Sequence, residues 1–144
     1  MATPSLHRVT ASVTIKAAPE RVFDAWLDPS VAARFLAAGD SNSATLKNDP
    51  REGGAFSLVM HGATADNAHE GHYVQIDRPR RLVFTWISNG TDRMLSLVTV
   101  SFTAVDGGVR VDLEHEGIPN EEKAGAHSRG WASIMAKLAA LDLS

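Results

Sequence analysis

The sequence predicts an α+β fold in which a curved, seven-stranded antiparallel sheet packs around one long C-terminal helix. Three patterns lead to this prediction. Residues Val9–Lys16 alternate between apolar and polar side chains, residues Ala44–Glu116 contain six further β-type segments, and apolar residues recur every three or four positions near the C terminus. Because the sheet must bury one face and only the last helix is long enough to cover it, we expect the helix to lie against the sheet.

Two short helices are expected after the first strand. Pro19 suits the first position of a helix, and Glu20 complements the positive end of the helix dipole. We expect Pro29 to end this helix and Ser30 to cap a second one that runs to Gly39.

Short turn-forming breaks separate the six later strands, and Asp106-Gly107-Gly108 is the strongest hairpin signal among them. Successive strands joined by such short breaks form an antiparallel meander. The expected strands are Ala44–Asn48, Ala55–His61, His69–Asp77, Arg81–Ser88, Met94–Val105 and Val109–Glu116.

The final helix is expected to begin at Asn120, a good capping residue, and to run to about Leu141. Glu121 lies in its first turn, where the helix dipole favours an acidic side chain. Its apolar stripe consists of Trp131, Ile134, Met135, Leu138 and Leu141.

The composition limits the classes of partner. The 144 residues are 44% hydrophobic and 22% charged, with a formal net charge of −3 and a pI near 6.0. Because there is no basic surplus and no long apolar run, we expect no nucleic-acid binding and no membrane insertion. The absence of cysteine excludes disulfides and is compatible with a cytoplasmic protein. We expect the protein to be a monomer or homodimer.

The sequence contains no repeat or linker. Residues 1–144 are therefore expected to form a single domain with its core at about residues 8–142.

The pairing of the third and fourth strands determines which polar side chains face the core. If the loop is Gly62–Ala68, then His61 pairs with His69, and Glu70 and His72 point inward with the apolar set of the third strand. A slip of one residue would reverse this arrangement.

Several segments, taken together, resemble the START-like (SRPBCC) superfamily and, within it, the domains similar to activators of the heat-shock-protein-90 ATPase. The segments that carry the resemblance are Ile15–Trp26, Asp49–Phe56, Glu70–Tyr73, Ile76–Trp86, Val98–Phe102, Leu113–Pro119 and Gly130-Trp131. The resemblance covers essentially the whole chain. It implies a helix-grip fold, like that of the birch pollen allergen, in which the sheet wraps the C-terminal helix around a cavity.

A cavity of this kind suits a small hydrophobic ligand, because aromatic and methionine side chains present adaptable apolar surfaces. Polar side chains at its rim, Arg93 among them, would orient the ligand, and neither a cofactor nor a metal is expected. The predicted ligand-binding residues are Phe35, Phe56, Leu58, Met60, Glu70, His72, Phe84, Trp86, Val98, Val100, His115, His127, Trp131 and Met135.

Other interpretations remain open at this level. Glu70 and His72 could perform acid–base chemistry, as in the cyclase and hydrolase members of the superfamily. However, no nucleophile elbow, phosphate loop or HExxH motif is present, so we predict no catalytic residue. The outer sheet face, with Arg110 and Glu114, could instead bind a chaperone or another protein partner.

The histidines also have alternative roles. His69 and His72 are three residues apart, and on a strand this spacing places them on opposite faces, which argues against a shared metal site. His115 could contact a ligand or could tie down the turn between the last strand and the helix through a hydrogen bond.

Overall fold

A computed structural model describes residues 6–39, 41, 43–62 and 64–143, and it shows the predicted α+β architecture. The elements are β1 (His7–Ile15), α1 (Pro19–Ala25), α2 (Pro29–Phe35), β2 (Ser43–Asn48), β3 (Ala55–His61), β4 (Asp66–Asp77), β5 (Arg81–Ser88), the 3₁₀ turn η1 (Asn89–Thr91), β6 (Ser96–Val105), β7 (Gly108–Ile118) and α3 (Glu121–Ala140).

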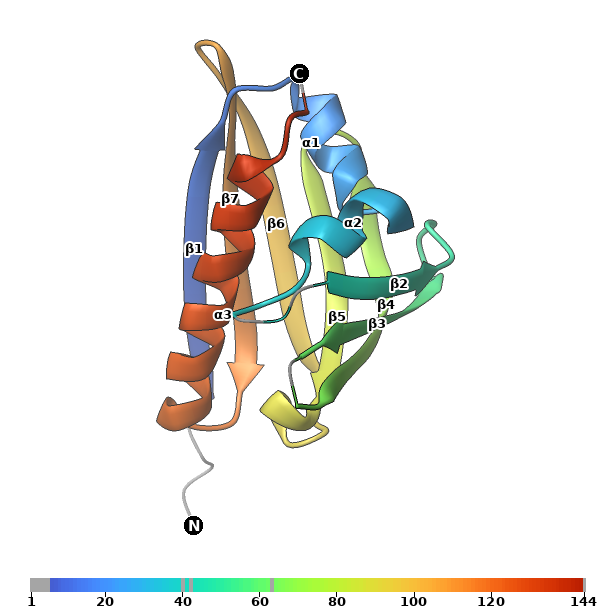
Figure 1. Cartoon of the computed structure of the whole chain (residues 1–144), viewed down its shortest axis with the longest axis vertical. Coiled ribbons are helices and arrows are strands. Elements are labelled where there is room, and N and C mark those ends of the chain that lie inside the picture. Colours follow the sequence, from blue (N-terminus) through green and yellow to red (C-terminus); the bar gives the residue numbers. More distant parts are fainter. Residues whose placement is uncertain (1–5, 40, 42, 63, 144) are drawn as a thin grey trace.

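The seven strands form one antiparallel sheet in the order β1-β7-β6-β5-β4-β3-β2. Helix α3 runs alongside β1 at one edge of the sheet, while α2 lies beside β2 at the other edge, so the curved sheet grips the long helix (Figure 1). The predicted helix-grip fold is therefore confirmed. No helix in the part of the chain that the structure describes is long and apolar enough to cross a membrane.

The ends of two helices illustrate how local chemistry places these elements. Asn120 caps α3 as predicted, because its side-chain oxygen accepts the backbone N–H of Lys123 at 2.9 Å. The cap of α2 was predicted wrongly. Asp28, rather than Ser30, accepts the free N–H at 3.0 Å, and Pro29 occupies the first helical position of α2.

The core lies between the inner sheet face and the helices, and on β6 and β7 it takes the side chains of alternate residues. The Asp106-Gly107 turn closes the β6–β7 hairpin, and Gly107 adopts the left-handed conformation at φ +77°. The largest side chains with almost no exposure are Phe23, Phe35, Leu58, Leu82, Leu113, Ile118, Ile134 and Leu138.

The pairing of β3 with β4 differs from the predicted one by three residues. Leu58 pairs with His69 instead of His72. The chain reverses sooner than predicted, because the N–H of Gly62 donates to the carbonyl of Ala65 at 3.1 Å and β4 already begins at Asp66.

An odd shift exchanges the two faces of a strand. His69, Gly71 and Tyr73 therefore face inward, and the predicted inward orientation of Glu70 and His72 is wrong. Both of these side chains are exposed on the outer face.

Candidate ligand pocket

A cavity of about 270 Å³ lies between α3 and the adjoining ends of β3, β4 and β5. It exists because α3 packs along β1, which leaves a gap between the helix and the far half of the curved sheet. The lining residues are Ala38, Met60, Asn67, Ala68, His69, Trp86, Ser88, Asn89, Gly90, Ala126, His127, Gly130, Trp131 and Ile134.

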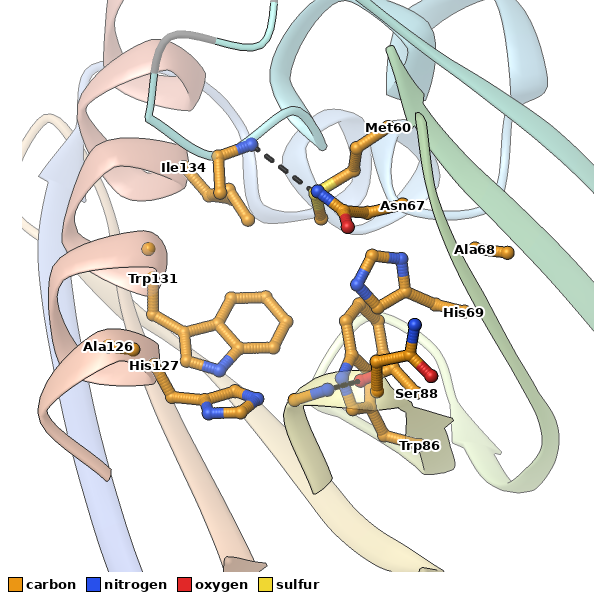
Figure 2. A pocket seen from close by; sticks show the side chains of 14 residues that line it. Met60, Asn67, Ala68, His69, Trp86, Ser88, Ala126, His127, Trp131 and Ile134 are labelled. Atoms are coloured by element: carbon orange, nitrogen blue, oxygen red, sulfur yellow. Dashed lines mark hydrogen bonds between the residues drawn. The ribbon is translucent and has the colours of Figure 1, made fainter. Parts of the chain in front are cut away.

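Aromatic rings line this pocket on two sides, which meet where Trp86 contacts Trp131. Trp131 and His127 project from α3, and His69 lies over Trp86 on the other side (Figure 2). The centroids of the His69 and Trp86 rings are 4.6 Å apart at an interplanar angle of 38°, and those of Trp86 and Trp131 are 5.2 Å apart. These flat surfaces can contact a planar apolar molecule over much of its area.

Small residues create the space between these walls. Ala126 and Gly130 lie one turn apart on α3, and each presents little or no side chain to the pocket. A Cβ atom on Gly90 would lie 2.9 Å from Cε1 of His127, so only glycine leaves this imidazole undisturbed.

A buried chain of hydrogen bonds supports the wall. The indole N–H of Trp131 donates to Nδ1 of His115 at 3.0 Å, so the neutral imidazole carries its proton on Nε2. This N–H donates to Oγ of Ser96 at 2.7 Å, and the Ser96 hydroxyl donates to the backbone carbonyl of Trp86 at 2.6 Å. The chain thus connects α3, β7, β6 and β5, and it anchors the indole of Trp131 and the backbone of Trp86.

His115 is fully buried and has both ring nitrogens occupied. Burial, with smaller contributions from the nearby imidazoles of His127 and His69, lowers the pKa of His115 to about 3. This geometry supports a structural hydrogen-bonding role for His115 rather than a direct contact with a ligand. Its bonds go to Trp131 of the pocket wall and to Ser96, which does not line the pocket.

His69 and His127 present polar edges to the cavity. Nδ1 of His127 donates to the carbonyl of Lys123 at 2.8 Å, and Nδ1 of His69 lies 3.3 Å from the carbonyl of Leu58. Burial is also the main reason why the pKa of His69 is lowered to about 4, so this imidazole is neutral near pH 7.

The segment after α2 closes one side of the pocket through Ala38, whose backbone N–H donates to Sδ of Met60 at 3.5 Å. Helix α3 also anchors this segment through hydrogen bonds. The ammonium of Lys137 donates to the carbonyls of Ala37, Gly39 and Ser41, the latter two at 3.1 Å.

Four of the predicted ligand-binding residues meet in this pocket, namely Met60, Trp86, His127 and Trp131. Phe56, Leu58 and Phe84 instead line, together with Trp86, a separate inner space of about 20 Å³, which is large enough for about one water molecule. The remaining apolar members of the predicted set line neither space and are buried in the core; they are Phe35, Val98, Val100 and Met135.

Glu70 and His72 lie outside the pocket, contrary to the prediction. The carboxylate of Glu70 is 3.6 Å from the guanidinium of Arg93 in an exposed ion pair, and Arg93 is not among the lining residues. The two residues therefore cannot act together as an acid–base pair on a molecule in the pocket.

Sequence reasoning missed His69 and the small residues of the lining. Gly71 carried a usable signal, since a glycine in a strand interior often marks a close approach. A Cβ atom at this position would lie 2.0 Å from the carbonyl oxygen of Thr85 and 2.7 Å from the ring of Phe56. Placing Gly71 against Phe56 would have turned His69 inward as well.

In the part of the chain that the structure describes, no group of three or more histidine, cysteine or acidic side chains is arranged to hold a metal ion. His69 and His72 lie on opposite faces of β4, as their spacing predicts. Nδ1 of His61 lies 3.3 Å from a carboxylate oxygen of Asp66, and Nε2 forms a hydrogen bond with Oγ1 of Thr45 at 2.7 Å.

Comparisons with solved structures support the fold. Protein CV1439 from Chromobacterium violaceum superimposes with a TM-score of 0.83 at 24% identity, covering 95% of this chain and 97% of that one. Ms6760 from Mycobacterium smegmatis gives 0.76 at 21% identity, with 94% and 90% covered. SA2116 from Staphylococcus aureus, described as a protein of unknown function, gives 0.77 at 17% identity, with 93% and 91% covered. At these identities, the likeness establishes the fold alone.

A comparison with curated protein sequences finds no match. The sequence does match one family over residues 16–141, the family described as activator of Hsp90 ATPase homolog 1-like protein. This region includes every strand after β1, all three α-helices and the whole pocket lining. The chain therefore belongs to the family of activator of Hsp90 ATPase homolog 1-like proteins.

Proposed function

We propose that this protein binds a small hydrophobic molecule in the pocket between α3 and strands β3–β5. The observation that carries the proposal is the cavity itself, which is bounded by the adjoining rings of Trp86 and Trp131 and by the side chain of Ile134. Its volume of about 270 Å³ is just below the usual range for small-molecule sites, roughly 300–1,000 Å³, and suits a small ligand. The combination of apolar walls with a few convergent polar groups is also typical of such sites.

A substitution that fills the pocket tests this proposal. The probe is 2-methoxynaphthalene, a planar and mostly apolar molecule, titrated by calorimetry and by quenching of tryptophan fluorescence. Ala126 is exposed at the pocket, so Ala126→Trp adds a large ring to the cavity at little cost to the core. We expect this variant to bind the probe at least about tenfold more weakly, a change of about 1.4 kcal/mol.

Ala132→Trp is the matched control, because Ala132 is also exposed on α3 but does not line the pocket. It should bind the probe with the affinity of the unaltered protein. Equal weakening in both variants, or an absence of saturable binding to the unaltered protein, would contradict the proposal.

A further inference from the structure

The described lining of the pocket contains no permanently charged side chain. None of its fourteen described residues is a lysine, arginine, aspartate or glutamate. Two pairs of oppositely charged side chains lie near the lining, Arg93 with Glu70 at 3.6 Å and Lys123 with Asp92 at 3.3 Å. A charged ligand would therefore lose its hydration without gaining a fixed counter-charge, which is a costly exchange.

The hydrogen bond of His127 fixes the chemistry of its other nitrogen. A carbonyl oxygen can only accept, so the contact of 2.8 Å with Lys123 requires the proton to lie on Nδ1. In the neutral imidazole, Nε2 is then an acceptor without a proton. A Cβ atom on Gly90 would lie only 3.2 Å from Nε2, so the glycine keeps this edge of the ring uncovered.

His69 adds a second imidazole of the same kind. Its Nδ1 lies 3.3 Å from the carbonyl of Leu58, which again requires the proton on Nδ1. Because burial lowers the pKa of His69 to about 4, its ring supplies no positive charge to the pocket near pH 7.

We propose that the pocket selects neutral, planar molecules that carry a hydroxyl or N–H donor, and that Nε2 of His127 is the acceptor that recognises this donor. The inference rests on the proposed function, since it names the class of ligand that the same pocket takes. A phenol or an indole fits the description, whereas the carboxylate of a similar ring system does not.

Three naphthalene derivatives of similar size test the inference, at about pH 8, where an ordinary imidazole is neutral. These are 2-naphthol, which has a donor; 2-methoxynaphthalene, which has none; and 2-naphthoate, which is an anion. One net hydrogen bond should make the naphthol bind about 3- to 10-fold more tightly than the methoxy compound, and the naphthoate should bind most weakly.

Substitutions at His127 identify the acceptor. His127→Phe keeps a ring of similar size but removes the acceptor, so the two neutral probes should bind this variant equally. His127→Gln retains an acceptor oxygen and should keep part of the preference. His72→Phe, on the exposed outer face, should behave like the unaltered protein.

The outcomes distinguish this inference from the proposed function. If none of the three probes binds, the proposed function fails. If the methoxy compound binds as tightly as the naphthol, or the naphthoate binds most tightly, the pocket exists but the inference is overturned. A preference that persists in His127→Phe also overturns it and transfers the acceptor role to another lining group, such as Asn67 or Ser88.

Discussion

Acid should destabilise this protein through His115, whose imidazole is neutral and fully buried. Burial lowers the pKa of His115 from 6.5 to about 3 in the folded protein, whereas the unfolded chain keeps the ordinary value. Between these two values, the unfolded state binds a proton that the folded state does not. The contribution of His115 to stability is therefore complete above about pH 6.5 and is lost progressively as the pH falls toward about 3.

The size of the effect follows from the shift. One pKa unit corresponds to about 1.4 kcal/mol, so lowering the pH from about 7.5 to about 5 should remove about 2 kcal/mol through His115 alone. This is a large share of the roughly 5–15 kcal/mol by which a domain is stable. His69 acts in the same direction, because burial lowers its pKa to about 4.

The test compares urea unfolding of the unaltered protein and of His115→Gln at several pH values. Glutamine can accept from Trp131 and donate to Ser96, but it does not titrate. The variant should lose about 2 kcal/mol less than the unaltered protein between about pH 7.5 and about pH 5.

Ser96→Ala serves as the control for this comparison. It leaves the N–H of His115 without its acceptor, so it should lower stability by about 1–3 kcal/mol at every pH. Its loss on acidification should nevertheless match that of the unaltered protein, because the buried imidazole remains. Parallel pH profiles for the unaltered protein and His115→Gln would refute the assignment of the effect to His115.

Three further substitutions test other parts of the fold. Lys137→Met removes the ammonium that donates to the carbonyls of Ala37, Gly39 and Ser41. It should lower the free energy of unfolding in urea by about 1–3 kcal/mol and speed the amide exchange of the segment next to the pocket. Unchanged exchange there would show that other contacts hold the segment. Gly71→Ala places a Cβ atom 2.0 Å from a backbone oxygen, so a loss of about 3 kcal/mol or more is expected in thermal unfolding, and a loss below about 1 kcal/mol would contradict the packing of β4 on β5. Leu138→Ala truncates a side chain with no exposure and should cost about 2–5 kcal/mol by the same assay, while a near-zero change would argue against the docking of α3.

The elements of the fold were predictable because local patterns specify them. The alternation in β1, the Asp106-Gly107 turn and the Asn120 cap each act over a few residues, and each is found as predicted. The inward-facing side chains were also predicted correctly on β6, where one face of the strand is apolar along most of its length.

The pairing of β3 with β4 lacked such a set. The inner face of β4 has only one large apolar residue before its irregularity, Tyr73, whereas Val74 is 53% exposed. The predicted loop, Gly62–Ala68, set the pairing instead, and it turned Glu70 and His72 inward in place of His69. The pocket was equally hard to predict from pattern, because much of its shape depends on residues that lack large side chains.

The two sides of the pocket differ in how much the stability of the protein depends on them. The sheet side depends on Trp86, which the core needs, but the helix side depends on Ala126 and Gly130. Gly130 weakens α3 by up to about 1 kcal/mol relative to alanine, and a Cβ atom there would only touch Cβ of Ala38 at 3.4 Å. Exchanges at these two helix positions can therefore resize the binding space, and so redirect the protein toward smaller molecules, while the β-sheet scaffold stays unchanged.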